Sequence, residues 1–201
     1  MNEESLINAI AGSKYVVHIA SPMFHSDDES GLVPPAINGT MAVMKACRAA
    51  NVRRCVMTSS GLAVMLMAEA DLPVDRVFNE SHFSNPNRPG GIPAYPKSKV
   101  LAERAAWDFV AALPEAEKFE LTVICPVFVM GPPLRKEPFS SGNFVKSMMD
   151  GSVPIIGSEL KPVCDVRDVA KAHLLAIKNP IAANRRFIIS SGSHNWQEFA
   201  R

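Results

Sequence analysis

Two kinds of hydrophobic pattern alternate along the chain: short apolar runs, and longer segments in which apolar residues recur at helical spacing. Short continuous runs are typical of strands that are buried on both faces of a parallel sheet. They predict strands at 15–20, 53–60, 119–129 and 186–190, with a shorter strand at 152–157. The helical spacing predicts helices at 33–51, 95–112, 142–150 and 165–180, and further helices near the two ends of the chain.

The alternation of strands and helices predicts an α/β fold, a Rossmann-like doubly wound parallel sheet with helices on both faces. In such sheets, ligands bind beyond the carboxyl ends of the strands. Three of the predicted strands end in small or hydroxyl-bearing residues, and the third is broken by Pro126. We therefore expect Ser21, Ser60 and Pro126 along one rim of the sheet, with Tyr95 entering from the next helix.

Composition and charge narrow the class of protein. With 201 residues, of which 47% are hydrophobic, the chain is long enough for one domain with a hydrophobic core. The net charge of +1 gives no sign of a nucleic-acid partner or a membrane-surface partner. No apolar run reaches the roughly 18 residues of a membrane span, and the acidic start lacks the pattern of a secretory signal.

The cysteines point to a reduced, cytoplasmic protein. None of them sits in a CxxC pair, and three fall in apolar runs. We expect buried thiols and no metal site, because metal-binding cysteines are usually closely spaced. The four residues are Cys47, Cys55, Cys125 and Cys164.

The segment AYPKSKVLAERAAW (94–107) carries the main candidate chemistry. Residues four apart on a helix share a face, so Tyr95 and Lys99 should lie close together. Pro96 suits the first helical turn, which places Tyr95 at the amino-terminal end of the helix. A nearby ammonium and the positive end of the helix dipole both favour a phenolate. We therefore expect the pKa of Tyr95 to be lowered toward neutral pH, where tyrosine can transfer a proton.

The same residues also have ordinary structural interpretations. A tyrosine four residues before a lysine is often a packed aromatic beside a solvated cation, and Ser59 and Ser60 both suit a turn. We expect His18 to be a packing residue in a buried strand. Asp165 and Asp168 open a predicted helix, where capping is the expected role.

Six motifs in one order carry a resemblance to a known family. They are HIASP, NGTMAVMKAC, RRCVMTSS, YPKSKVLAERAAW, PVFVMGPPL and DVRDVAKAH. In this order they resemble the extended short-chain dehydrogenase/reductases of the NAD-dependent epimerase/dehydratase superfamily. They are most similar to the branch of the dihydroflavonol reductases and cinnamoyl-CoA reductases, and the resemblance covers essentially the whole chain.

The resemblance implies hydride transfer between NADP(H) and a small-molecule aldehyde or ketone. It implies a catalytic triad in which Ser60 orients the carbonyl, Tyr95 donates the proton, and Lys99 lowers the pKa of the tyrosine and binds the nicotinamide ribose. The cofactor-binding residues that it implies are Ile19, Ala20, Ser21, Tyr95, Lys99, Pro126, Val129 and Ser141. The family segment that distinguishes NADP from NAD is not found in this sequence, so NAD(H) stays an alternative cofactor.

The chain departs from the family at the glycine-rich turn. None of its eleven glycines forms the G-x-x-G-x-x-G or G-x-G-x-x-G pattern that holds a pyrophosphate. We therefore expect residues 1–201 to be a partial, N-terminally truncated NAD(P)-binding domain that lacks the first βαβαβ portion. Residues 140–165 and 190–201 are expected to contribute to an incomplete substrate lobe. Met65 differs from the residue that dihydroflavonol reductases carry there, which favours a generic aldehyde or ketone reductase.

Two hypotheses of different class remain open. The triad motif favours an NADP(H)-dependent carbonyl reductase. The lack of a glycine-rich turn favours a non-catalytic Rossmann-like remnant that acts only through protein binding. In a doubly wound sheet, strand 15–20 lies beside a strand that this sequence does not contain, so we expect an exposed sheet edge through which the chain can form homo-oligomers.

Overall fold

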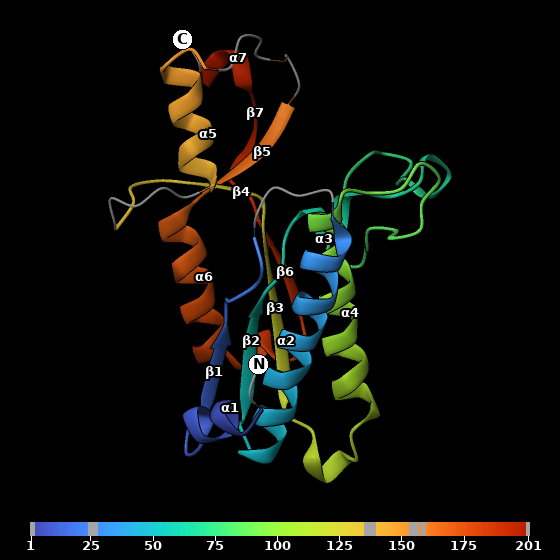
Figure 1. Ribbon diagram of the computed structural model, residues 1–201, viewed down its shortest axis with the longest axis vertical. Helices are drawn as coiled ribbons and strands as arrows, with labels where there is room; N and C mark the ends of the chain where they lie inside the picture. Colours follow the sequence, from blue (N-terminus) through green and yellow to red (C-terminus); the bar gives the residue numbers. More distant parts are fainter. Residues whose placement is uncertain (1–2, 24–27, 135–139, 153–156, 158–159, 200–201) are drawn as a thin grey trace.

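The computed structural model describes residues 3–23, 28–134, 140–152, 157 and 160–199. Within these residues, a parallel sheet with the strand order β1-β2-β3-β6 runs through the middle of the molecule (Figure 1). Its strands are β1 (Tyr15–His18), β2 (Arg54–Thr58), β3 (Glu120–Pro126) and β6 (Arg186–Ile189). Nearly every residue of β2 and β3 is buried, which explains why their sequences are almost continuously apolar.

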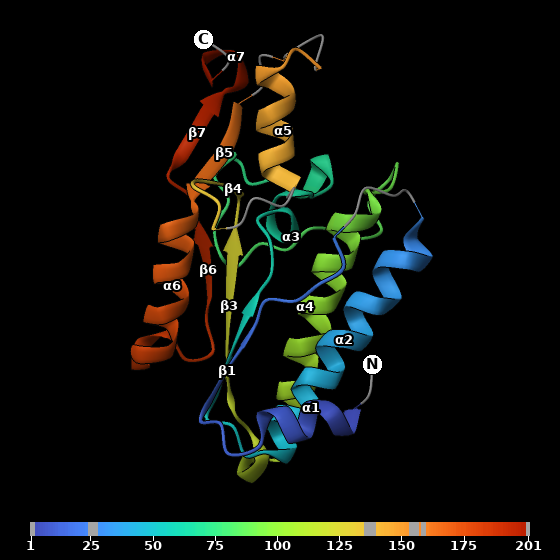
Figure 2. The same cartoon turned by 60° about the vertical axis from the view of Figure 1, so that its left-hand side comes forward.

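Helices cover both faces of this sheet, as Figure 2 shows. The long helices α2 (Glu29–Ala49) and α4 (Ala94–Ala112) pack side by side on one face, and the short helix α1 (Glu3–Ile10) packs against α2. The helix α6 (Val166–Lys178) covers the opposite face. The doubly wound α/β fold expected from the sequence is therefore confirmed.

Hydrophobic cores form on the two faces of the sheet. The larger core lies between the sheet and the pair α2 and α4, and includes Met44, Ala106 and Leu121. A smaller core lies under α6 and includes Val56 and Ile124. Because β2 and β3 contribute side chains to both cores, they are the most firmly held strands, and their carboxyl ends give a fixed frame for a site.

A second, smaller sheet lies beyond the carboxyl end of the large one. Among the described residues its order is β4-β5-β7, with β4 and β5 parallel and β7 antiparallel. The elements of this part are β4 (Phe128–Met130), α5 (Ser140–Met149), β5 (Leu160–Asp165), β7 (Gly192–Asn195) and α7 (Trp196–Phe199). The chain crosses from β3 to β4 at Val127, directly after Pro126, whose ring nitrogen cannot donate a ladder hydrogen bond.

Four short helices lie outside these layers. They are α3 (Leu62–Met65) and the 3₁₀ helices η1 (Glu69–Asp71), η2 (Glu115–Glu117) and η3 (Pro180–Ala182), counted over the described residues. Apart from η1, the segment 68–93 is irregular, as its sequence indicates, and it leads into α4.

Most predicted elements are present, and two strands and one α-helix of the structure were not predicted. The strands β5 and β7 and the helix α3 are missing from the prediction, because their sequences are too polar or too short to stand out. The strand predicted at 152–157 falls mainly on residues outside the described part of the chain. The assignment of 140–165 and 190–201 to a substrate lobe stays a prediction.

The prediction that a helix starts at Val33 is wrong, because α2 begins at Glu29. Asp28 caps it, with its Oδ1 accepting a hydrogen bond from the Ser30 amide at 2.9 Å. Pro34 and Pro35 therefore lie inside the helix. The capping prediction for Asp165 is confirmed, since its Oδ1 accepts from the Arg167 amide at 2.7 Å; no such contact is found for Asp168 in the described residues.

The two edges of the large sheet differ in exposure. At the β6 edge, Glu80 Oε1 accepts a hydrogen bond from the Ile188 amide at 3.1 Å, so a side chain covers part of that edge. At the β1 edge, no described residue pairs with the outer side of the strand, and Val17 is 40% exposed. Self-association through the β1 edge stays a prediction.

Two further findings concern the described residues alone. No helix among them is both long enough and apolar enough to cross a membrane. They contain no cluster of three or more histidine, cysteine, aspartate or glutamate residues that could hold a metal ion. The expectation of buried thiols is confirmed, since all four cysteines are buried and free.

Candidate active site

A cavity of about 810 Å³ lies at the carboxyl ends of β1, β2 and β3, where the large sheet meets the small one. The residues predicted for the triad and for the cofactor gather in its wall, with the exception of Ala20. Those in the wall are Ile19, Ser21, Ser60, Tyr95, Lys99, Pro126, Val129 and Ser141. The residues expected along one rim of the sheet, Ser21, Ser60 and Pro126, therefore line one cavity together with Tyr95.

Tyr95 and Lys99 enter the cavity from the first turns of α4. The helix begins at Ala94, so Tyr95 lies in its first turn, as the sequence predicts. One turn later, Lys99 Nζ lies 5.7 Å from the centroid of the Tyr95 ring. Lys99 is only 6% exposed, so its ammonium group is held inside the protein.

Ser60 follows β2 and is held in place by the backbone. The Ser59 amide donates to the Ile124 carbonyl and the Gly61 amide to the Pro126 carbonyl, both at 2.7 Å. A Cβ on Gly61 would lie 2.9 Å from Val127 Cγ1, so only glycine permits this close approach. The Ser60 Oγ accepts a hydrogen bond from the Leu62 amide at 3.1 Å, which is the turn contact expected of it. The Ser60 hydroxyl also acts on the Tyr95 phenol, whose pKa it lowers.

The expectation that the pKa of Tyr95 is lowered is wrong. Burial raises the pKa of Tyr95 above its ordinary value, and the hydrogen bond with Ser60 offsets only part of that rise. Burial also lowers the pKa of Lys99 to about 8, against an opposing effect of Cys125. The physical reason is that a poorly solvated site disfavours the charged form of both groups. At neutral pH, Tyr95 is a neutral phenol and Lys99 is still mostly protonated.

We predict that Lys99→Met changes how stability depends on pH. The folded-state pKa of Lys99, about 8, lies below its ordinary value of 10.5. Between these values the unfolded chain binds more protons than the folded chain, so the destabilising effect of burying the Lys99 ammonium decreases as pH rises. At full size this destabilising effect is on the order of 3 kcal/mol. Lys99→Met should therefore be more stable than the parent at pH 7.5, and the difference should shrink toward pH 10.

Urea unfolding of both proteins at the two pH values measures this difference. The variant must be compared with the parent because other buried groups also change stability in this range of pH. Burial raises the pKa of Cys125 to about 12, so Cys125 makes the protein less stable as pH rises. A parent and a variant whose stabilities change in parallel between pH 7.5 and pH 10 would show that Lys99 is not held in a buried, poorly solvated place.

His18 lies at the end of β1, near the cavity but not in its wall. Its Nε2 lies 3.3 Å from Thr40 Oγ1 on α2. Burial, together with the charge of Lys99, lowers the pKa of His18 to about 4. His18 is therefore neutral at physiological pH, as the packing role predicted for it requires.

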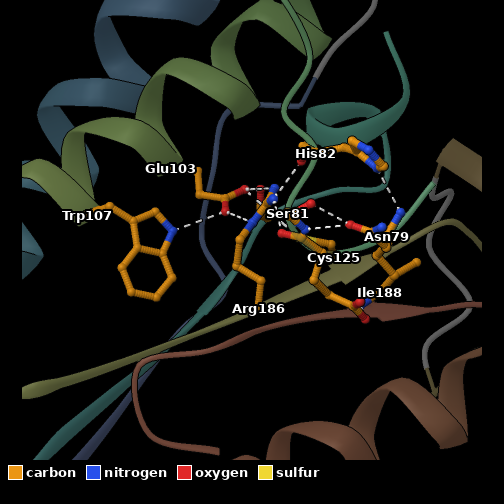
Figure 3. A network of polar contacts seen from close by, with 10 residues as sticks. Asn79, Ser81, His82, Glu103, Trp107, Cys125, Arg186 and Ile188 are labelled. Carbon is orange, nitrogen blue, oxygen red and sulfur yellow. Dashed lines mark hydrogen bonds and ion pairs between the residues drawn. The ribbon is translucent and has the colours of Figure 1, made fainter. Parts of the chain in front are cut away.

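Sequence reasoning missed two features of the site. The first is an aromatic group on the side of the small sheet: the ring centroids of Phe128 and Trp196 lie 5.1 Å apart, and both rings also contact Phe144. The second is Glu103, a fully buried carboxylate one turn after Lys99, which Figure 3 shows pointing at Arg186. The spacing of Lys99 and Glu103 is a signal, but it is equally typical of a solvated ion pair.

The residues present fit one half of a nicotinamide dinucleotide. Lys99 Nζ has no hydrogen-bond acceptor among the described residues, so its donors remain available to ribose hydroxyls. The hydroxyls of Ser60 and Tyr95 and the apolar side chains of Ile19 and Val129 share the same cavity. A planar nicotinamide needs such a mixed surface. For the pyrophosphate, the sequence offers no glycine-rich turn.

Comparisons with known proteins show the family to which the chain belongs. Residues 1–190 match the family described as the NAD dependent epimerase/dehydratase family. The chain is 34% identical to the NADPH-dependent methylglyoxal reductase of Saccharomyces cerevisiae, over 92% of this chain and 58% of that protein. It is 35% identical to cinnamoyl-CoA reductase 1 of Arabidopsis thaliana, over 95% of this chain and 54% of that protein.

Solved structures show the same likeness. The crystal structure of yeast methylglyoxal/isovaleraldehyde reductase complexed with NADPH superposes with a TM-score of 0.83 and 32% sequence identity. The match covers 98% of this chain and 61% of that one. The chain therefore spans less than two thirds of the length of these relatives.

Proposed function

Because the chain belongs to the NAD dependent epimerase/dehydratase family, we propose that it is an NADP(H)-dependent oxidoreductase that reduces an aldehyde or a ketone. The observation that supports this proposal is the meeting of Ser60, Tyr95 and Lys99 in one cavity at the carboxyl end of a doubly wound sheet. Ser60 comes from one chain segment and Tyr95 with Lys99 from another, far from it in sequence. A set of polar residues with a purely structural role would not need to meet in one cavity.

The proposed roles follow from the geometry and the charge of each group. When bound, the reduced nicotinamide supplies hydride to the carbonyl carbon. Ser60 donates a hydrogen bond to the carbonyl oxygen and orients it. Tyr95, kept as a neutral phenol by burial, donates its proton to the same oxygen. The ammonium of Lys99 stabilises the phenolate that remains, and this ammonium is the main form below pH 8 or so.

The choice of NADP(H) and of a carbonyl substrate rests on the relatives. The yeast protein is named as NADPH-dependent and as a reductase of methylglyoxal, and the plant protein as a reductase of cinnamoyl-CoA. These substrates share a reactive carbonyl group and little else. We therefore propose the reaction class for this chain and leave the individual aldehyde or ketone to experiment.

The test is a cofactor-oxidation assay on the protein produced from its own gene. NADPH and NADH are each offered with small, branched and aromatic aldehydes, and NADPH binding is measured by calorimetry. We expect aldehyde-dependent oxidation of NADPH, and a loss of roughly 100-fold or more in Ser60→Ala. Binding of NADPH without oxidation by any aldehyde or ketone would contradict the reductase proposal. If the protein neither binds nor oxidises NADPH, the result favours the alternative of a non-catalytic remnant that acts only through protein binding.

A further inference from the structure

Glu103 lies on the face of α4 that packs on the sheet, and its side chain is completely buried. Its two oxygens are both occupied (Figure 3). Oε1 accepts from Arg186 Nε at 2.5 Å and from Trp107 Nε1 at 3.2 Å, and Oε2 accepts from Ser59 Oγ at 2.6 Å. A buried carboxylate is tolerated only when it is paired and hydrogen-bonded, so Glu103 has one defined place in the fold.

The groups around Glu103 belong to the strand ends that build the cavity. Ser59 directly precedes Ser60 after β2, and Cys125 directly precedes Pro126 in β3, with Cys125 Sγ 3.9 Å from Glu103 Oε2. Ser59 lies in the cavity wall beside Ser60, and Pro126 lines the cavity next to Cys125. The groups that contact the carboxylate are therefore in the cavity wall or directly beside it. One carboxylate thus connects the ends of two strands to the helix that carries the tyrosine and the lysine.

Arg186 keeps the carboxylate from shifting. Its Nη1 donates to the carbonyl oxygens of Glu80 at 2.7 Å and of His82 at 2.6 Å. Its guanidinium also lies 3.7 Å from the centroid of the Phe83 ring. These three residues belong to the irregular segment that leads into α4. The ion pair therefore cannot move without moving the chain that enters the helix just before the tyrosine.

From these contacts we propose that Glu103 is the positioning residue of the candidate active site: its carboxylate holds the Ser59–Ser60 segment against α4, and so sets the distance between Ser60 and Tyr95. This inference rests on the proposed function, because it concerns the relative placement of the proposed triad. Glu103 does not touch the substrate, and it acts through Ser59. A small displacement of aligned groups is enough to slow a reaction by up to 100-fold or so.

A second ion pair in the same sheet provides a matched control. Arg54 Nε donates to Glu120 Oε2 at 2.6 Å, and the Arg54 side chain is as deeply buried as that of Arg186. This pair joins β2 and β3 near their amino ends and reaches the carbonyls at the end of α6, among them Asn179 O at 2.8 Å. None of its members lines the cavity. It has the same two charged groups as the Glu103 pair and no contact with the triad, but the Glu120 side chain is 31% exposed whereas Glu103 is fully buried.

The first measurement requires no turnover. The chain contains two tyrosines, so a Tyr15→Phe background leaves Tyr95 as the single tyrosine signal in an NMR spectrum of tyrosine-labelled protein. The ammonium of Lys99 lies 5.7 Å from that ring, so the signal should respond to pH near 8. We expect Ser59→Ala and Glu103→Gln to shift the Tyr95 signal and its response to pH. We expect Glu120→Gln to leave both as they are.

The second measurement separates positioning from stability. In the enzyme assay, Glu103→Gln and Ser59→Ala should lower kcat by roughly 10- to 100-fold while KM for the carbonyl changes by less than about threefold. Glu120→Gln should leave kcat within about twofold. In a Ser60→Ala background, Glu103→Gln should lower kcat by no more than about twofold further, because residues that act as a unit are not additive.

Each outcome decides between the alternatives. If Glu103→Gln does not fold, Ser59→Ala still removes the link to Ser60 while leaving the ion pair in place. If Ser59→Ala behaves like Glu120→Gln in both measurements, Glu103 serves stability alone and the inference is overturned. If the parent reduces no carbonyl, the proposed function fails. In that case the tyrosine signal still decides whether Glu103 places Tyr95.

Discussion

Tyr95→Phe is expected to abolish carbonyl reduction while leaving cofactor binding nearly unchanged. The change removes one oxygen atom, and that oxygen carries the proton that the proposed reaction needs. General acids of this kind contribute roughly 100- to 10,000-fold to rate, so a loss in that range is expected. The aromatic ring itself stays, so the Lys99 Nζ keeps its position 5.7 Å from the centroid of that ring. Steady-state kinetics and a titration with NADPH measure the two effects separately.

The natural control for this variant is Tyr15→Phe, which makes the same chemical change at the start of β1, outside the wall of the cavity. Its turnover should match that of the parent. The assignment of Tyr95 as the proton donor is wrong if Tyr95→Phe keeps more than about a tenth of the parent's turnover.

Arg186→Met is expected to cost a large part of the protein's stability. It would leave the carboxylate of Glu103 buried and without its cation, and it would free two carbonyl oxygens of the segment 80–82. Breaking one partner of a buried ion pair typically costs about 3–5 kcal/mol, against a total stability of about 5–15 kcal/mol for a domain. Urea unfolding at neutral pH measures this loss.

Two further variants make this prediction specific. Arg185→Met removes the same charge from the neighbouring exposed residue and should change stability by less than about 0.5 kcal/mol. The double variant Glu103→Leu/Arg186→Met removes both charges and should recover part of the loss, because replacing a whole buried pair is often nearly neutral. A loss below about 1 kcal/mol in Arg186→Met would mean that the pair is well solvated after all.

The sequence predicts the frame of the site well because the frame depends on local patterns. The runs that become β2 and β3 are apolar because both faces are buried, and Tyr95 and Lys99 meet because of helical geometry. Serine at the end of β2 reaches the same cavity because parallel strands share one carboxyl edge.

The features that the prediction missed depend on long-range packing. Glu103 and Arg186 are 83 residues apart in sequence, and nothing local distinguishes Glu103 from a solvated helix residue. The residues of β7 are almost all exposed and polar, and the strand exists because it pairs with β5. The pKa of Tyr95 was expected to fall because a cation and a helix terminus lie nearby. It rises because burial, which no pattern of neighbours reveals, has the larger effect.

The crossing of the chain from one sheet to the other at Val127 has a consequence for how such a protein can diversify. Pro126 and Val129 lie on either side of this residue in the same cavity wall, yet the first belongs to the parallel sheet and the second to the small one. Under the proposed function, substitutions on the side that carries Val129, Phe144 and Trp196 can change substrate preference without altering the half that holds Ser60. A length change at the crossing would uncouple the two halves, so evolutionary insertions should accumulate elsewhere. Under the proposed function, the crossing connects the part of the protein that carries the chemical step to the part that would select the substrate.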